Sequence, residues 1–236
     1  MALNRILVID VGGTHIKLQA TIHKEPVIIP SGPKMTAKKM VAAVKKYTAD
    51  WGIDVISMGF PGPVVHNHII SEPYNLGRGW VGFNFAKAFG CPVKIINDAA
   101  MQALADYRGR RMLFLGLGTG LGSAMIIDGV MEPMELAHLP YKNGKTYEDY
   151  VGLSGLRRLG KKKWRQEVRD IVKKFKAALQ VDYIVVGGGN SRLLKKLPDG
   201  AQLGRNLDVF QGGYRLWKKN LINKKGHWPD LINRNT

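Results

Sequence analysis

Ile6-Leu-Val-Ile-Asp-Val-Gly-Gly-Thr-His-Ile-Lys-Leu-Gln-Ala-Thr-Ile22 and Met112-Leu-Phe-Leu-Gly-Leu-Gly-Thr-Gly-Leu-Gly-Ser-Ala-Met-Ile-Ile127 decide the fold of this chain. Each stretch runs as an apolar strand, a turn of glycine and threonine, and a second strand. After Gly13, apolar side chains recur at every second position from Ile16 to Ile22, a period that indicates a strand. Rossmann and Walker motifs need a helix directly after the glycines, because the helix N-terminus binds the phosphate. Both motifs are therefore excluded, and the sequence predicts two β-hairpins.

Tight glycine turns of this kind can bind an anion. Glycine lets the backbone approach a ligand closely, so that the N–H groups of the turn contact phosphate. The simpler interpretation is two ordinary hairpins, but Asp10-x-Gly-Gly-Thr-x-x-Lys17 has a matching second copy, which favours a phosphate site. Lys17 either reaches the phosphates or is an ordinary surface residue of its strand. The candidate phosphate-binding residues are Gly12, Gly13, Thr14, Lys17, Gly118, Thr119 and Gly120.

The composition is that of a globular protein. The chain has 236 residues, of which 45% are hydrophobic and 23% charged, and it is long enough for one large domain or two small ones. The duplicated hairpin favours two. No apolar run reaches the length of a membrane span, and the first twenty residues hold a hairpin instead of a signal peptide. Together with the single Cys91, which fits a reducing compartment, this predicts a cytoplasmic protein without membrane contact.

The chain is strongly basic. Lys and Arg number 36 against 18 Asp and Glu, a net charge of +18, which implies a polyanionic partner or a solubility device. The run 161–176 places five apolar residues at helical spacing and predicts a helix with a wet, basic face. Such a run is usually a solvated surface, and only its place in a phosphate-binding half of the chain favours a binding role.

Periodicity elsewhere predicts alternating strands and helices. We expect strands at 26–29, 55–59, 93–96 and 183–186, and helices from Thr36, at 99–105, at 161–179 and, briefly, from Ser191. Thr36 is a suitable N-cap for a helix with an apolar stripe that runs from Met40 to Tyr47. Residues 218–236 are basic with little periodicity and are expected to be mobile.

Several motifs together resemble one known family. Asp10-Val-Gly-Gly-Thr14, Asn97-Asp98-Ala99, Gly116-Leu-Gly-Thr-Gly120 and Gly187-Gly-Gly-Asn190 occur in the order and approximate spacing of the ROK family of sugar kinases. The chain looks most like the polyphosphate glucokinases of that family. That likeness extends to Asn75-Leu-x-x-x-Trp80, Glu135-Leu-Ala-His138, Gly144-Lys-Thr-Tyr-Glu148 and Lys163-Trp164. It covers most of the chain up to about residue 200.

The resemblance implies an α/β fold of the actin/hexokinase class, which is ribonuclease-H-like, with two lobes and a central interlobe cleft. Residues 1–108 are expected to form the N-terminal lobe, with the first phosphate hairpin and a catalytic aspartate. Residues 109–236 are expected to form the C-terminal lobe, with the second hairpin, a sugar motif and the basic helix.

Phosphoryl transfer to a hydroxyl needs a carboxylate that accepts the alcohol proton and a metal that neutralises the phosphates. Asp98 is the candidate base, because a carboxylate at a strand end beside a helix N-terminus is held rigidly. A plain helix cap is the alternative. Asp10 follows four apolar strand residues and needs a partner for its charge, for which Mg²⁺ or its water shell is expected.

The sugar site is carried over from the resemblance. Glu135 and His138 are three residues apart and can meet on one helical turn. Ala137 stands where the family usually has glycine, which could shift the backbone of His138. ROK members with zinc carry a cysteine cluster after this histidine, and this chain has none, so no zinc is expected. The expected sugar-binding residues are Asn75, Asn97, Asp98, Glu135, His138 and Glu148.

The leading hypothesis is therefore a glucokinase that phosphorylates the 6-hydroxyl of glucose. Gly187, Gly188 and Gly189 favour ATP as donor, because the family's corresponding loop approaches adenosine, whereas the positive charge favours polyphosphate. A homodimer is kept open. An inert sugar or phosphate sensor is the alternative, and a generic nucleic-acid binder leaves the paired hairpins unexplained. A DNA-binding regulator is disfavoured, since only five residues precede the first strand, and no DNA partner is expected.

Overall fold

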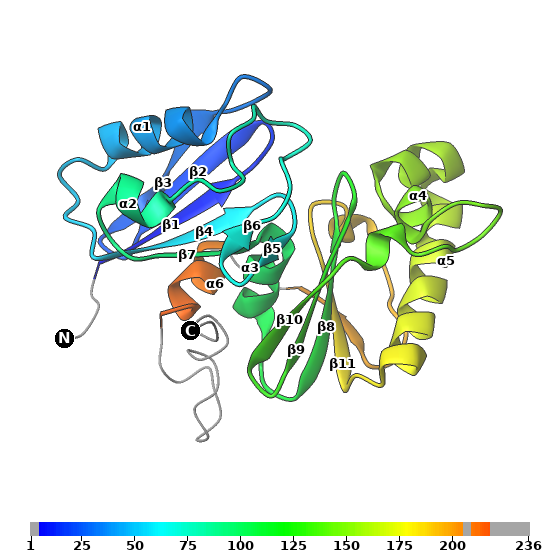
Figure 1. Ribbon diagram of the computed structural model, residues 1–236. Coiled ribbons are helices and arrows are strands. Elements are labelled where there is room, and N and C mark those ends of the chain that lie inside the picture. Colours follow the sequence, from blue (N-terminus) through cyan, green and yellow to red (C-terminus); the bar gives the residue numbers. More distant parts are fainter. Residues whose placement is uncertain (1–4, 205–208, 218–236) are drawn as a thin grey trace. The chain divides into compact units, whose positions relative to one another are not determined.

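The computed structural model describes residues 5–204 and 209–217, and these fall into two compact units. Unit 1 comprises residues up to Ala105 together with 209–217, and unit 2 runs from Asp106 to Gly204. Each unit contains one five-stranded sheet, and the first two strands of that sheet along the chain form one of the two glycine hairpins (Figure 1).

The sheet of unit 1 has the strand order β3-β2-β1-β4-β7. The central strand β1 is antiparallel to β2 and parallel to β4, which is in turn parallel to β7. β1 is apolar on both faces, as expected for a strand covered from two sides. The strands are β1 Ile6–Val11, β2 His15–Ala20, β3 His23–Pro30, β4 Val55–Phe60 and β7 Val93–Asn97, with a small hairpin of β5 Val64–Val65 and β6 His68–Ile69.

Helices cover both faces of this sheet. Leu7, Ile9 and Val11 of β1 belong to a core with α1 Ala37–Tyr47 and α2 Phe85–Phe89. Ile6 and Val8 point to the opposite face, where they pack with α3 Asp98–Asp106 and α6 Val209–Arg215. Figure 1 shows α1 on one side of the sheet and α6 on the other. The alternation of β1 therefore serves two cores.

Thr36 is the N-cap of α1, as the sequence predicts, because its hydroxyl accepts from the N–H of Lys39. The buried stripe of α1 consists of Ala37, Met40, Val41 and Val44. The expectation for Tyr47 is wrong, since its side chain is exposed at the last turn.

α6 is held to unit 1 by close backbone packing. The Ser57 hydroxyl on β4 donates to the Gly213 carbonyl at 2.6 Å and accepts from the Trp217 indole N–H at 3.0 Å. Gly212 lies directly on α3, so that a Cβ at this position would collide with the Met101 carbonyl. The sequence placed all of 109–236 in the second lobe; for 209–217 this is wrong, because α6 contacts β1 and β4 of unit 1. The segment 218–236, expected to be mobile, lies outside the described residues.

Unit 2 repeats the theme with the strand order β10-β9-β8-β11-β12. β8 is antiparallel to β9 and parallel to β11. The elements are β8 Arg111–Leu117, β9 Leu121–Ile127, β10 Val130–Met134, β11 Tyr183–Gly187 and β12 Ala201–Leu203, with α4 Tyr147–Val151, α5 Leu153–Leu179 and 3₁₀ turns at Leu136–His138 and Ser191–Leu193.

α5 is two helical segments joined at Gly160, whose φ of 71° is not helical. The second segment agrees with the predicted helix at 161–179, and the five apolar residues expected inside are buried: Trp164, Val168, Ile171, Val172 and Phe175. The Trp164 indole donates to the Val151 carbonyl at 2.9 Å, which ties α5 to α4. Among the described residues, no helix is both long and apolar enough to cross a membrane.

Gly212→Ala should loosen α6, because the new methyl group meets the backbone of α3 and such overpacking costs about 1–3 kcal/mol. We expect a lower urea midpoint and faster proteolytic cleavage near residue 209. The control is Gln211→Ala, which changes an exposed neighbour on the same helix. Equal stability of the two variants would contradict the packing described for α6.

Candidate active site

Predicted site residues of unit 1 gather at one edge of its sheet. The parallel strands β1, β4 and β7 end there at Val11, Phe60 and Asn97. In register, Asp10 lies beside Gly59, and Gly59 lies beside Ile96. Because neighbouring strands are about 4.8 Å apart, β1 and β7 are separated by roughly 10 Å. Gly59 places no side chain between them.

The first glycine turn is closed by a backbone hydrogen bond and has no side chains at Gly12 and Gly13. The Gly12 N–H donates to the His15 carbonyl at 3.0 Å, and a Cβ on Gly12 would lie 2.7 Å from that oxygen. A Cβ on Gly13 would lie 2.9 Å from Cβ of Asn75. The structure thus brings the predicted sugar ligand Asn75 against the predicted phosphate turn, and Thr14 remains exposed beside them.

Asp10 is largely buried, with 17% of its side chain exposed, and Lys17 is its neighbour across the hairpin. Lys17 Nζ lies 3.6 Å from Asp10 Oδ2. The negative charge of Asp10 therefore has a protein cation, Lys17, as one partner, and its binding of Mg²⁺ stays a prediction. Lys17 belongs to the edge of this site, and its contact with phosphates stays a prediction.

Asn97, not Asp98, is the N-cap of α3. The Asn97 side-chain oxygen accepts from the N–H groups of Ala99 at 2.8 Å and Ala100 at 3.3 Å, and its amide donates to the Gly62 carbonyl at 3.1 Å. Asp98 is the first helical residue, and its carboxylate accepts from the Ala99 N–H at 2.7 Å. The structure thus gives the capping role, which was the alternative considered for Asp98, to its neighbour.

The second turn is tied to α4 and α5. The Gly118 N–H donates to the Gly120 carbonyl at 3.1 Å, and the Thr119 carbonyl accepts from the Leu153 N–H at 3.0 Å, where α5 begins. The Glu148 carboxylate accepts from the Leu121 N–H at 2.9 Å. It fills the space at Gly120, since a Cβ there would lie 2.2 Å from Glu148 Oε2.

The triple glycine follows β11, beside the same turn. Gly188 has a φ of 81°, and a Cβ there would lie 2.6 Å from both the N and the O atom of Leu117. A Cβ on Gly187 would meet the Phe114 ring, whereas none of the described atoms lies within 4 Å of one on Gly189. The Asn190 amide donates to the Gly118 carbonyl at 2.9 Å. Packing accounts for two of the three glycines, and Gly189 alone faces open space.

Three of the predicted sugar-binding residues belong to unit 2, namely Glu135, His138 and Glu148. His138 Nε2 lies 4.0 Å from Glu135 Oε2, with side chains 73% and 53% exposed, respectively. Partial burial raises the pKa of Glu135; His138 opposes this shift, and the negative charge of Glu148 adds to it. Ala137, the departure from the family pattern, is buried with Leu136. Glu148 thus bonds to the glycine turn and also acts on Glu135 through its charge.

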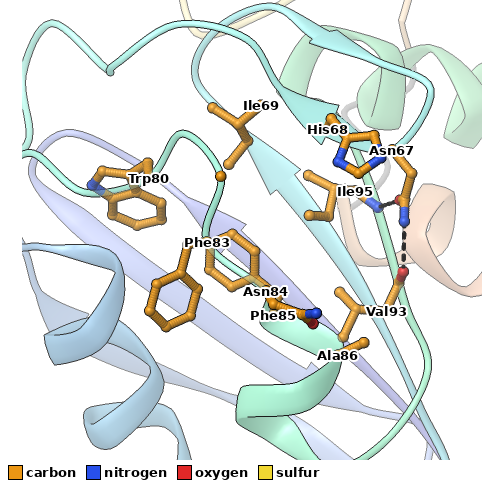
Figure 2. A pocket seen from close by; sticks show the side chains of 11 residues that line it. Asn67, His68, Ile69, Trp80, Phe83, Asn84, Phe85, Ala86, Val93 and Ile95 are labelled. Carbon is orange, nitrogen blue, oxygen red and sulfur yellow. Dashed lines mark hydrogen bonds between the residues drawn. The ribbon is translucent and has the colours of Figure 1, made fainter.

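A separate pocket of about 200 Å³ in unit 1 contains none of these residues (Figure 2). Its wall is about as polar as it is apolar, with Trp80, Phe83 and Phe85 on one side. The Asn67 amide donates to the Val93 carbonyl, and its oxygen accepts from the Ile95 N–H. The Asn67 side chain thus satisfies backbone groups on the open edge of β7, which is a structural role.

Sequence reasoning missed two parts of the site. The Glu72 carboxylate accepts from the N–H groups of Gly79, Trp80 and Val81, and so shapes the loop that carries Asn75. The segment 31–36 adjoins the first turn, because the Ser31 N–H donates to the Thr14 carbonyl at 2.9 Å. The only signal for this segment in the sequence is a Ser-Gly-Pro turn before the Thr36 cap.

Comparison with known proteins identifies the family of this chain. The model of the ROK family matches residues 6–132. The chain belongs to the ROK family. A polyphosphate glucokinase of Mycobacterium tuberculosis is 29% identical over 182 residues, which cover 71% of this chain and 67% of the relative. This ROK chain is thus related to sugar kinases over most of its length.

Two solved structures share the fold of this ROK chain. The inorganic polyphosphate/ATP-glucomannokinase of Arthrobacter sp. strain KM superposes with a TM-score of 0.72 at 22% identity, over 98% of this chain and 99% of that one. The ROK glucokinase of Streptomyces griseus, in complex with glucose and AMPPNP, gives 0.64 at 16% identity, over 88% and 96%. The predicted actin/hexokinase-like α/β class is confirmed.

Glu148→Gln should lower the pKa of Glu135, because the substitution removes a neighbouring negative charge that favours protonation. Glutamine keeps an acceptor for the Leu121 N–H, so the turn should persist. Carbon-detected NMR titration of the carboxyl groups measures the shift. Glu132→Gln, at an exposed position of β10, is the control. An unchanged Glu135 pKa would show that the two carboxylates do not interact.

Proposed function

We propose that this protein is a hexokinase of the glucokinase type, which transfers a phosphoryl group from polyphosphate, ATP or both to the 6-hydroxyl of glucose. The observation that carries the proposal is that each glycine turn lies against a polar side chain predicted to bind the sugar. In unit 1 the turn lies against Asn75, at the sheet edge that carries Asp98. In unit 2 the turn is bonded to Glu148, beside Glu135 and His138. The names of the relatives support this activity.

Asp98 is proposed as the general base. The glucose 6-hydroxyl gives its proton to the Asp98 carboxylate as its oxygen bonds to the terminal phosphorus, and the bond from that phosphorus to the donor's bridging oxygen breaks. The Asn97 cap fixes where α3 begins and hence where the Asp98 backbone lies. A base held at a helix start is well placed for this step, because its position does not depend on a flexible loop.

Mg²⁺ is the metal expected with such donors, and Asp10 is the residue proposed to hold it, through water. Within the described part of the chain, no cluster of three or more His, Cys, Asp and Glu could hold a metal. One carboxylate is nevertheless sufficient, because Mg²⁺ keeps several waters and binds phosphate oxygens directly. When bound, the ion neutralises charge on the donor phosphates. Lys17 is positioned to share the Asp10 carboxylate.

The hexose is proposed to bind Asn75, Asn97, Asp98, Glu135, His138 and Glu148. Several of these side chains already have one protein partner that fixes them. Asn97 spends its oxygen on α3 and one amide hydrogen on Gly62, which leaves its second amide hydrogen for a sugar hydroxyl. Glu148 has one oxygen on Leu121. Polar groups held in this way discriminate a hydroxylated substrate through paired hydrogen bonds.

Basic side chains on α5 favour polyphosphate as one donor. The helix begins at the second turn, where Leu153 bonds to Thr119. Further along, Lys161, Lys162 and Lys163 form no ion pair within the described residues. The two acidic residues of α5, Glu167 and Asp170, instead receive the Tyr141 hydroxyl and the Lys142 ammonium. The first half of α5, which begins at the phosphate turn, therefore keeps its positive charge.

ATP is the donor favoured by the triple glycine, and Gly189 is the member of the triplet whose face is open. An inert sugar or phosphate sensor would use the same turns and sugar motif without turnover. Steady-state assays with several hexoses against ATP and long-chain polyphosphate separate these functions. Binding of glucose without turnover of either donor would favour the sensor.

Asp98→Asn should lower kcat by about 10² or more, since it removes the proton acceptor and keeps a similar shape. The KM for glucose should change little. The control is Asp50→Asn, which alters an exposed aspartate beyond α1. Activity of Asp98→Asn within tenfold of the wild type would exclude Asp98 as the base.

Replacing Lys161, Lys162 and Lys163 by Gln should raise the KM for long polyphosphate. The slope of log KM against log salt should fall by roughly 0.7 for each lost phosphate contact. The KM for ATP should depend much less on salt, because ATP has only three phosphates. The matched control replaces Lys38, Lys45 and Lys46, three exposed lysines of α1. Equal effects of the two triple variants would reduce the α5 charge to a solubility feature.

A further inference from the structure

An open cavity of about 470 Å³ adjoins the first glycine turn in unit 1. The pairing of His15 with Pro30 brings the end of β3 beside that turn, and the Ser31 N–H donates to the Thr14 carbonyl at 2.9 Å. The segment that follows β3 also contacts the Asn75 loop, since the Gly77 N–H donates to the Met35 carbonyl at 2.9 Å. The cavity is lined by Ser31, Gly32, Pro33, Lys34, Met35 and Lys39.

The charge of this cavity is positive. Lys34 and Lys39 are its charged lining residues, and neither forms an ion pair with a described acidic side chain. Lys39 Nζ donates to the backbone carbonyl of Lys34 at 3.2 Å, which holds the Lys39 side chain against this segment. The first turn of α1 follows and has no acidic residue. The partial positive charge of a helix N-terminus adds to that of the lysines.

Ser31 provides a second, independent observation. Its hydroxyl oxygen is buried and has no hydrogen-bond partner among the residues that the structure describes. Buried hydroxyl groups are normally hydrogen-bonded, so an unpaired one calls for a ligand or a water molecule. Ser31 is one of the residues that line the cavity.

Gly32 leaves the backbone open at the same place. Its φ is 131°, and a Cβ on Gly32 would have no neighbour among the described atoms within 4 Å. A side chain here would be strained and would narrow the cavity. The Ser31 hydroxyl and the two ammonium groups, each with hydrogens left to donate, lie beside this bare backbone, and such donors suit a phosphate group.

We propose that Ser31, Lys34 and Lys39 form a subsite for a phosphate of a linear phosphate chain, beyond the phosphates bound by the first glycine turn. This inference rests on the proposed kinase function and deepens its donor side. A long polyphosphate has further phosphates to place in the cavity, whereas ATP has adenosine beyond its three phosphates. The subsite therefore favours polyphosphate over ATP, through unit 1 and independently of α5.

The test compares Lys34→Ala/Lys39→Ala with Lys38→Ala/Lys45→Ala, which removes the same charge from exposed positions of α1 outside the cavity. Tripolyphosphate and long-chain polyphosphate are the probes, and calorimetry measures their binding without glucose. We expect the first variant to bind both probes roughly tenfold more weakly. The salt slope should fall by roughly 0.7 for each lysine lost. The control should stay within twofold of the wild type.

Glucose 6-phosphate carries the same phosphate chemistry and defines the second arm of the test. Its binding should be equal in the wild type and in Lys34→Ala/Lys39→Ala. An equal loss of affinity for glucose 6-phosphate would assign the cavity to the product and overturn the proposal. Equal losses of polyphosphate affinity in the two double variants would also overturn it. Ser31→Ala should weaken the binding of tripolyphosphate without changing its salt slope, because the substitution removes a hydrogen-bond donor but no charge.

Calorimetry keeps this inference separate from the kinase proposal. If no donor is turned over by the wild type, the kinase function fails, and the difference in tripolyphosphate binding between the two double variants still tests the subsite. If turnover is normal and that difference is absent, the subsite alone is overturned. Circular dichroism and urea midpoints establish that the variants are folded.

Discussion

A glycine turn with no room for side chains of its own is the constraint on which each unit depends. In unit 1, Gly12 has the His15 carbonyl where a Cβ would lie, and Gly13 has Asn75 there. In unit 2, the Glu148 carboxylate fills the corresponding space at Gly120. Because no larger residue fits, the neighbouring loops approach the turn backbone directly. The same absence of side chains that permits this packing also lets an anion approach the turn backbone closely.

The sheets explain why distant parts of the sequence reach these turns. Parallel strands end at the same edge, so the segments after β1, β4 and β7 meet in unit 1 and those after β8 and β11 meet in unit 2. Ligands of open α/β sheets bind at such carboxyl ends. Caps and packing then hold the edge in place. The Asn97 cap starts α3 there, and α6 presses on the same helix through Gly212.

Charge is distributed unevenly over this scaffold. The Tyr141 hydroxyl donates to Glu167 and Asp170, and burial together with these acceptors raises its pKa far above the ordinary value. Lys142 and Lys174 complete the cluster. The acidic residues of α5 are thus occupied in a structural contact, whereas the lysines near its start and those beside the first turn remain available. An overall charge of +18 therefore has local consequences at the turns.

The amino-acid sequence by itself determined the two hairpins, most of the other strands, the Thr36 cap and the buried face of the helix at 161–179, because these follow from local periodicity and capping chemistry. It also placed the chain in the ROK family. Only the tertiary structure decided that α6 returns to unit 1, that Asn97 caps α3, and that Glu148 joins the second turn to Glu135. It alone revealed the Ser31–Lys39 cavity beside the first turn. These features depend on which strands pair and which backbones come close. A short segment such as 209–215 has no periodicity from which the element that it packs against can be predicted.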